Sequence, residues 1–225
     1  EYYIENEDGV SFGGIELWKT NGNPRQSIRV KSFEDSQCSE MIYFKGNIYF
    51  SSSESIHGDE LWRTNGKTSG TLMFKDIFYG KSGSSPKQFT VFNDELYFTA
   101  SDEEYGRQLW KTDGTTLGTV RVTTFTSSPN FMGNNWQSYW QGEITYLTAL
   151  DTRLVFCLDL GGNVCIMHST DGNINQSTMF SPIVDNDILP LYSYPNGYYT
   201  NDDIRERMYS SFAVLNNEVY FTAND

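Results

Sequence analysis

Hydrophobic and polar residues alternate along most of the chain, and the alternation is clearest between residues 88 and 124. A period of two is typical of half-buried β-strands, and turn-forming pairs such as Asn93-Asp94 and Asp113-Gly114 separate the alternating segments. The pattern predicts four short antiparallel strands, named a to d in chain order. Their expected ranges are 88–92, 95–100, 107–112 and 119–124.

The same plan recurs because one phrase, Glu/Gln-Leu-Trp-Lys/Arg-Thr-Asn/Asp-Gly, occurs three times, at residues 16–22, 60–66 and 108–114. A Tyr-Phe pair in the expected strand b stands before the last two copies, with Phe50 and Phe98 each ten positions ahead of the phrase. The same offset from Phe156 identifies a degenerate copy of the motif, in which His168 replaces the Trp and a Thr-Asp-Gly turn follows.

The equivalent residues Phe50, Phe98, Phe156 and Phe221 are 48, 58 and 65 positions apart, which indicates a repeat array with expanded units. Four short antiparallel strands per unit predict an all-β fold, a β-propeller-like array of four-stranded blades. We expect about four units in one propeller or propeller segment over 1–225. Their approximate ranges are 1–39, 40–87, 88–146 and 147–210, with 211–225 beginning a further unit.

The chain starts and stops in a strand b, so we expect it to be part of a longer propeller. A compact four-bladed array with a redundant edge strand is the alternative.

Residues 60–71 and 108–119 resemble the ELWxxDGTxxGT repeat, which occurs in large secreted or surface proteins of hyalin-like type. The resemblance is looser in the first unit, and the fourth keeps only Thr170-Asp171-Gly172. It implies a propeller-like extracellular array without established catalytic residues.

Composition narrows the choice of partners. The chain has 225 residues, 38% of them hydrophobic, and a net charge of −13. A surface this acidic disfavours nucleic acid, because phosphate binding needs basic residues. No apolar run reaches the length of about 18–20 residues that a membrane span needs. Protein partners, or glycans, are therefore expected rather than nucleic acid or membrane insertion.

Three cysteines and one sequon favour an extracellular or cell-surface location. Cys157 and Cys165 flank a Gly-Gly-Asn turn, and a hairpin centred there would place them opposite each other as a disulfide. Two buried thiols are the alternative. Cys38 is left over, and Asn175 begins the one N-glycosylation sequon.

The repeated Trp18, Trp62 and Trp110 are expected to serve the structural core, since a residue present once per blade usually packs between blades. Strand parity then places the b–c connections and the d–a links at one end of the sheets. Two long d–a links, at about 125–143 and 180–209, are rich in aromatic residues. Partner- or glycan-binding residues are expected at this end: Trp136, Tyr139, Trp140, Tyr194, Tyr198, Asp102, Glu103 and Glu104.

No catalytic residues are predicted. The two histidines stand apart, His57 in a b–c connection and His168 at the Trp position of a blade, and no nucleophile elbow, P-loop or zinc motif occurs. No cofactor and no dedicated metal site are expected, although carboxylates with backbone carbonyls could also hold Ca²⁺. The chain is therefore not read as an enzyme.

These observations favour a non-enzymatic extracellular structural or interaction module. It would be a repeat propeller that mediates protein–protein association in a surface, matrix or filament assembly. The alternative is a lectin-like propeller that binds glycans through the aromatic and acidic loops of one face.

Overall fold

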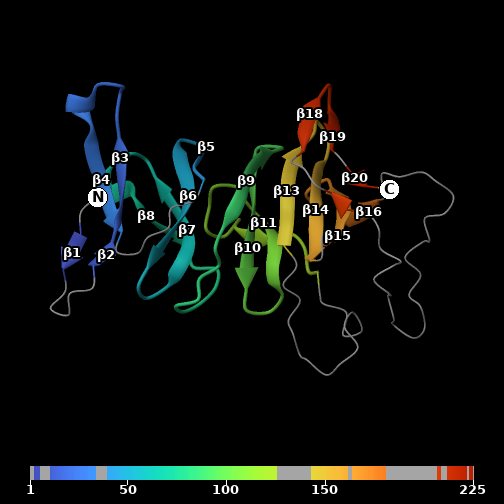
Figure 1. Ribbon diagram of the computed structural model, residues 1–225, viewed down its shortest axis with the longest axis horizontal. Coiled ribbons are helices and arrows are strands. Elements are labelled where there is room, and N and C mark those ends of the chain that lie inside the picture. The colour runs from blue at the N-terminus through green and yellow to red at the C-terminus, as the bar shows by residue number, and fades with distance from the viewer. Residues whose placement is uncertain are drawn as a thin grey trace. The chain divides into compact units, whose positions relative to one another are not determined.

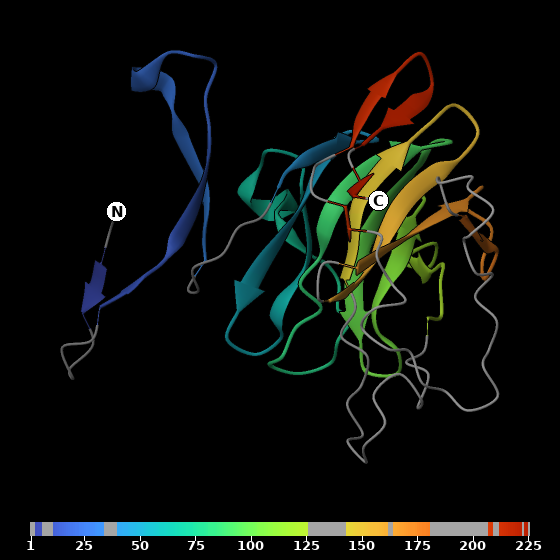
Figure 2. The same cartoon turned by 45° about the vertical axis from the view of Figure 1, so that its right-hand side comes forward.

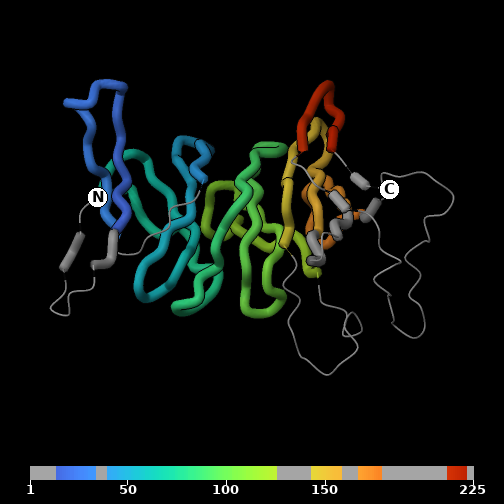
Figure 3. The backbone as a smooth tube through the Cα atoms, in the orientation of Figure 1, coloured from blue at the N-terminus to red at the C-terminus, as the bar shows by residue number. Residues whose placement is uncertain are grey.

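The computed structural model describes eight segments of the chain (Figure 3). They are residues 3–5, 11–33, 40–125, 143–161, 164–180, 207–208, 212–221 and 223–224. Contacts along the backbone divide the chain into two compact units, Glu1–Glu104 with Trp110–Val120 and Tyr105–Leu109 with Arg121–Asp225.

Three four-stranded antiparallel sheets follow the predicted plan (Figure 1). The first contains β5 (Ile42–Phe44), β6 (Asn47–Glu54), β7 (Gly58–Thr64) and β8 (Leu72–Lys75). The second contains β9 (Lys87–Phe92), β10 (Glu95–Asp102), β11 (Gly106–Thr112) and β12 (Val120–Arg121). The third contains β13 (Glu143–Ala149), β14 (Leu154–Gly161), β15 (Val164–Thr170) and β16 (Ser177–Phe180).

In each sheet the strands lie in sequence order, which is the strand order of a propeller blade. The prediction of an all-β, propeller-like array of four-stranded antiparallel sheets is therefore confirmed.

The remaining described strands form two-stranded sheets. β3 (Ile15–Lys19) pairs with β4 (Ile28–Phe33), and the two strands are drawn in blue in Figure 2. β18 (Ala213–Leu215) pairs with β19 (Glu218–Tyr220). The other pairs are β1 (Tyr3–Glu5) with β2 (Ser11–Gly13) and β17 (Arg207–Met208) with β20 (Ala223–Asn224).

Two short 3-10 turns, η1 (Pro24–Gln26) and η2 (Thr68–Gly70), each precede a fourth strand of the repeat. None of the described residues belongs to a helix long and apolar enough to cross a membrane.

The a–b hairpins close through two-residue turns with positive φ at both positions. Lys45 and Gly46 have φ angles of 44° and 81°, and Asn93-Asp94 and Asn216-Asn217 adopt the same left-handed conformation. Such turns match the right-handed twist of the strands that they join. The same local rule therefore starts the second, third and last repeats.

The Thr-Asn/Asp-Gly turn after strand c is held by its own side chains in all four copies. The Thr hydroxyl accepts from the Gly N–H at 3.0 Å in the second copy and 3.1 Å in the third. The first and fourth copies make the same bond, at 3.1 and 3.0 Å. The Gly residues have φ between 80° and 98°, which favours glycine. The turn thus needs no ligand or partner to explain it.

The second glycine of the long motif lies close to the side chain of the turn residue Asn65 or Asp113. A Cβ at Gly70 would lie 2.0 Å from Asn65 Oδ1, and one at Gly118 would lie 2.1 Å from Asp113 Oδ1. The looser first unit has Gln26 at this place, and its Oε1 accepts from Asn21 Nδ2 at 2.7 Å. The first unit therefore replaces close packing by a hydrogen bond.

Strand d of the third unit is shorter than predicted, since 119–124 was expected and β12 covers only Val120–Arg121. The reason is a side chain that enters the ladder. Leu109 N donates to Thr123 Oγ1 at 3.0 Å, while Val122 N and Thr123 N both donate to Leu109 O. A local hydrogen bond of this kind competes with regular strand pairing.

The b–c connection and the following d–a link lie together at one end of the β5–β8 sheet. Asp59 O accepts from both Ser84 N and Ser85 N at 2.8 Å. Gly58 and Gly83 allow this approach, because a Cβ on Gly83 would come 2.2 Å from Asp59 N. The parity argument is confirmed for this sheet.

Hydrophobic clusters lie between successive repeats. Within the first compact unit, Leu17, Val30 and Phe33 of the first repeat pack with Phe50 and Trp62 of the second. A second cluster joins the second and third repeats, including Tyr49, Leu61, Phe74, Phe98 and Trp110. Within the other compact unit, Val155, Cys157 and Met167 pack with Tyr146, Leu150, Phe212, Val219 and Phe221.

Candidate interaction surface

The first residue of the motif, Glu60, is a buried carboxylate that organises the d–a link. It is 0% exposed. Its oxygens accept from Ile77 N at 2.9 Å, Phe78 N at 3.0 Å and Ser84 Oγ at 2.6 Å. Burial raises the pKa of Glu60, and the nearby Asp76 acts in the same direction, although the three hydrogen bonds oppose the shift. The carboxylate of Glu60 is therefore used to hold the d–a link in place.

Gln108 stands at the same place in the third copy and is also fully buried. Its Nε2 donates to Tyr105 O at 3.0 Å and to Phe125 O at 2.9 Å. Its Oε1 accepts from Phe125 N at 2.8 Å and from Thr123 Oγ1 at 2.9 Å. The third copy therefore holds its link with a neutral amide that uses both donors and acceptors.

Trp62 and Trp110 lie in the core, with 3% and 8% of their surfaces exposed. Trp62 contacts Phe33 of the preceding repeat edge to face, with ring centroids 5.1 Å apart. Trp110 belongs to the cluster shared by the second and third repeats. For these two residues, the structure agrees with a core role.

Trp18 is different, and the prediction that it belongs to the core is wrong, because 51% of its surface is exposed. Trp62 is covered by the β3–β4 sheet and Phe50, whereas no described cluster covers Trp18 in the same way. Its neighbour Leu17 points to the opposite side and is buried against the second repeat. The β3–β4 sheet therefore has one buried face and one open face.

The open face of β3–β4 carries Trp18 and an ion pair. Trp18 lies opposite Arg29 in register. Beside Trp18, Arg29 Nη1 donates to Glu16 Oε1 at 2.7 Å, and Trp18 Nε1 donates to Glu16 Oε2 at 3.0 Å. The hydrogen bond from Arg29 lowers the pKa of Glu16. The tryptophan ring is thus held in place but not covered.

His168 is buried rather than available for proton transfer. It stacks on Phe156, with centroids 5.6 Å apart and planes 11° apart, and meets Phe125 edge-on at 5.0 Å. Burial lowers its pKa to about 4, so the ring is neutral at physiological pH. His168 fills the aromatic place that the repeat assigns to Trp.

His57 is only partly covered, with 31% of its side chain exposed. Its Nδ1 lies 2.5 Å from Glu54 Oε1, and its Nε2 lies 4.0 Å from Asp76 Oδ2. The residues that the structure describes contain no group of three or more His, Cys, Asp or Glu side chains placed to hold a metal ion.

The acidic candidates at the b–c connection of the third repeat do not act as one group. Asp102 is 8% exposed, and its Oδ1 accepts from Glu104 N at 3.0 Å, which caps the turn. Glu103 and Glu104 are exposed. Asp102 therefore has a structural role, and only the two glutamates face solvent.

The aromatic candidates lie outside the described residues, and their role in partner or glycan binding stays a prediction. They are Trp136, Tyr139, Trp140, Tyr194 and Tyr198.

The predicted Cys157–Cys165 register is wrong by two residues. Cys157 lies opposite Met167, and Cys165 lies opposite Asp159. Cys157 is nevertheless disulfide-bonded and fully buried. The side chains of Cys38 and Cys165 are not among those described. Centring the hairpin on Gly161 failed because Gly161 is itself a paired strand residue, opposite Val164, so the pairing is displaced toward the C-terminus.

Asn175 lies in an exposed turn, as the sequon requires. Its φ is 57°, and its N–H donates to Val122 O at 2.7 Å.

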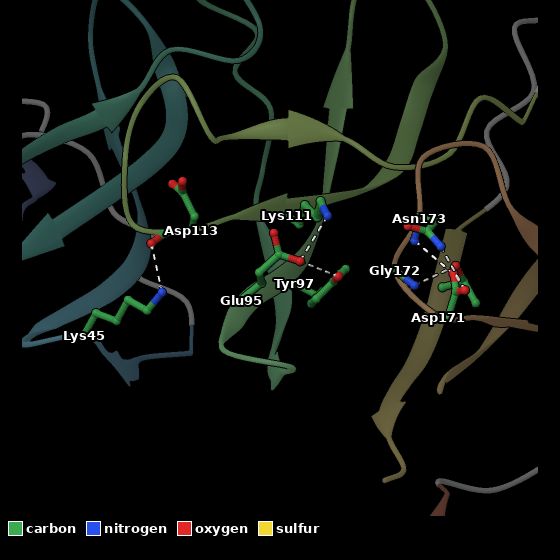
Figure 4. A network of polar contacts seen from close by, with 9 residues as sticks. Lys45, Glu95, Tyr97, Lys111, Asp113, Asp171, Gly172 and Asn173 are labelled. Atoms are coloured by element: carbon green, nitrogen blue, oxygen red, sulfur yellow. Dashed lines mark hydrogen bonds and ion pairs between the residues drawn. The ribbon is translucent and has the colours of Figure 1, made fainter. Parts of the chain in front are cut away.

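Sequence reasoning missed a polar triad in the third repeat (Figure 4). Lys111 Nζ lies 3.0 Å from Glu95 Oε2, and Tyr97 OH donates to the same oxygen at 2.9 Å. The signal was available in the alternation, because Glu95 and Tyr97 are two positions apart and so share a face of strand b.

No protein-family model matches the chain, and no curated protein matches it. A solved structure that does match comes from a structural and mechanistic study of two prolyl endopeptidases and their inter-domain dynamics. It has a TM-score of 0.45 and 10% sequence identity, and the match covers 73% of this chain and 22% of that chain. This chain therefore spans less than a quarter of that protein's length. The resemblance to ELWxxDGTxxGT repeats stays a prediction.

Proposed function

We infer that the chain is a non-enzymatic repeat module that mediates protein–protein association in an extracellular or cell-surface assembly. The observation that carries this proposal is the open face of β3–β4. The motif Trp is buried against an adjoining repeat in the second and third copies, but Trp18 is half exposed in the first. A large aromatic side chain left open at a repeat boundary is typical of an association surface.

A structural rather than catalytic role is supported by how the buried polar groups are used. Glu60 accepts three hydrogen bonds from the d–a link, Gln108 bonds to both the b–c connection and the d–a link, Asp102 caps a turn, and buried His168 is neutral. The polar side chains of the motif therefore hold the fold.

The extracellular setting is supported by two observations. Cys157 is disulfide-bonded, and disulfides persist mainly in oxidising compartments. Asn175 offers a sequon on an exposed turn.

The proposal is tested by placing a photo-activated cross-linking amino acid at position 18 in the cells that produce the protein. We expect cross-links to a polypeptide. We also expect a membrane-impermeant reducing agent to reach the protein in every cell fraction. A matched probe at Leu117, which is 95% exposed on a c–d turn, serves as control. Equal labelling at both positions, or a protein held only inside the cell, would overturn the proposal.

A further inference from the structure

His57 lies in the b–c connection of the second repeat, between two carboxylates. Its Nδ1 is 2.5 Å from Glu54 Oε1, and its Nε2 faces Asp76 Oδ2 at 4.0 Å. Glu54 is the last residue of β6, whereas Asp76 directly follows β8 and begins the d–a link. One imidazole ring therefore stands between the two segments that emerge at this end of the β5–β8 sheet.

A neutral ring can make only one of these two contacts. A carboxylate only accepts, so the first ring proton is on Nδ1 and is donated to Glu54. The lone pair of Nε2 then points to the carboxylate of Asp76, across a distance too long for a hydrogen bond. A second proton, on Nε2, turns this contact into an attraction. The charge of an imidazole changes between about pH 5 and 8.

Asp76 has an unmet need for such a partner. Its Oδ1 is buried and has no hydrogen-bond partner within the part of the chain that the structure describes. Burial raises the pKa of nearby Glu60, and the charge of Asp76 adds to the rise, which shows that the two acids repel each other. The ion pairs of lysine and arginine in the described segments go to other acids. His57 is therefore the cation available to Asp76.

The d–a link is anchored at both ends and open in the middle. At its start, Ile77 N and Phe78 N donate to Glu60, and at its end Ser84 N and Ser85 N donate to Asp59 O. Residues 79–82 between these anchors are exposed. A contact at the base of an exposed segment limits its local opening. The contact of Asp76 with His57 is placed to do this.

Exposed apolar side chains flank the contact on both segments. Ile56, next to His57 in the b–c connection, is 67% exposed, and Tyr79 of the d–a link is 76% exposed. Both segments lie at the end of the sheet where partner binding is predicted. The state of the link therefore affects how this surface is presented.

We propose that His57 is a pH-dependent latch, in which a second proton on the imidazole ties the b–c connection to the d–a link through Asp76. The latch is closed below about pH 6 and open at about pH 8. It goes beyond the proposed function and does not depend on it.

The other charged groups of these segments do not replace His57. Asp59 accepts from the Ser51 hydroxyl, and Lys81 is exposed. Glu60 gains its proton at a higher pH than an ordinary carboxyl, and this lessens the repulsion on Asp76. Acidification therefore acts in the same direction at both groups, and substitutions are needed to separate them.

The first test is limited digestion with trypsin at pH 6 and pH 8, read by mass spectrometry. Cleavage after Lys81 reports opening of the link, and cleavage after Lys67, on an exposed c–d turn, corrects for the activity of the protease. The ratio of the two rates is expected to rise about threefold from pH 6 to pH 8, an effect that one partly exposed ion pair can supply.

Variants assign the effect to the latch. His57→Gln and Asp76→Asn should each give a ratio that does not change with pH. His57→Lys keeps a positive charge at both pH values, so its ratio should stay low at pH 8. A merely structural role of the ring would not give this rescue. Glu103→Gln, on an exposed acid in the b–c connection of the third repeat, is the control and should respond as wild type.

Amide hydrogen exchange of residues 76–85, corrected for the intrinsic effect of pH, repeats the measurement without a protease. Circular dichroism verifies that each variant is folded. Equal protection of the wild-type link at pH 6 and pH 8 would overturn the proposal. So would a full pH response in His57→Gln, which would assign the effect to Glu60 instead.

Discussion

The second and third copies of the motif share Leu-Trp and the Thr-Asn/Asp-Gly turn, but they differ at the residue before. Glu60 faces three donors: two backbone N–H groups and the Ser84 hydroxyl. Gln108 faces two carbonyl oxygens as well as an N–H and a hydroxyl. This side chain is therefore matched to the backbone that surrounds it, since an acceptor-only group suits donors and an amide suits both.

Exchanging the side chains should break this match, and the largest effect is expected for Gln108→Glu. One carboxylate oxygen would face Tyr105 O and Phe125 O with no donor between them. An uncompensated buried charge of this kind costs about 3–5 kcal/mol of unfolding free energy. Urea denaturation at neutral pH measures the loss.

Gln176→Glu adds the same charge on an exposed turn and is the control, with little expected change. If Gln108→Glu were no more harmful than this control, the carbonyl contacts would not matter and the comparison would fail.

The reverse exchange, Glu60→Gln, is expected to be milder, about 1–2 kcal/mol. The amide nitrogen would face the N–H of Ile77 or Phe78, where an oxygen now accepts. The variant also removes a buried charge, which offsets part of the loss. Glu103→Gln, on an exposed side chain, is the matched control.

The cost of Glu60→Gln should also depend on pH. The pKa of Glu60 is raised in the folded state, so the folded protein keeps a proton that the unfolded chain has released. This carboxyl therefore contributes less stability as the pH rises from 4.5, its ordinary value, through the raised folded pKa. The variant has no such loss, so its deficit relative to wild type should shrink over that window. A deficit that grows with pH would contradict the raised pKa.

The smallest losses of stability are expected in the c–d turn that the two copies share, and the losses should be equal in the two copies. Gly70→Ala and Gly118→Ala would each push aside the Asn65 or Asp113 side chain and weaken its turn contact. Each should cost about 1 kcal/mol, the typical worth of one hydrogen bond. Thermal melts of the two variants, run together, test the equality. A difference as large as that between the two exchanges above would show that the shared turn is not equivalent.

Local signals predicted the sheets well because each depends on residues close in sequence. The alternation around Leu96-Tyr97-Phe98 and the Asn93-Asp94 turn specify one hairpin without help from the rest of the chain. Strand d of the third repeat was overestimated, since its β-branched alternation could not reveal that the Thr123 hydroxyl takes the place of a ladder acceptor.

The candidate site was predicted less well. Trp18 and Trp62 occupy the same position of the same sequence motif. The exposure of Trp18 therefore follows from what packs beside it and not from the motif itself. The cysteine register failed because Gly161 pairs with Val164 instead of standing at the centre of the turn, which changes which residues oppose each other. All five aromatic candidates fall outside the described residues and remain predictions.

By itself, the sequence determined the repeat, the strand order within each sheet and the turns between strands, because hydrogen bonds and side-chain alternation act over a few residues. Only the tertiary structure decided which copies of a repeated residue are buried. Burial depends on what packs against a surface: Phe33 packs against Trp62, whereas Trp18 is left exposed. The same holds for Glu60 and Gln108, whose partners come from links up to 24 residues away in the chain.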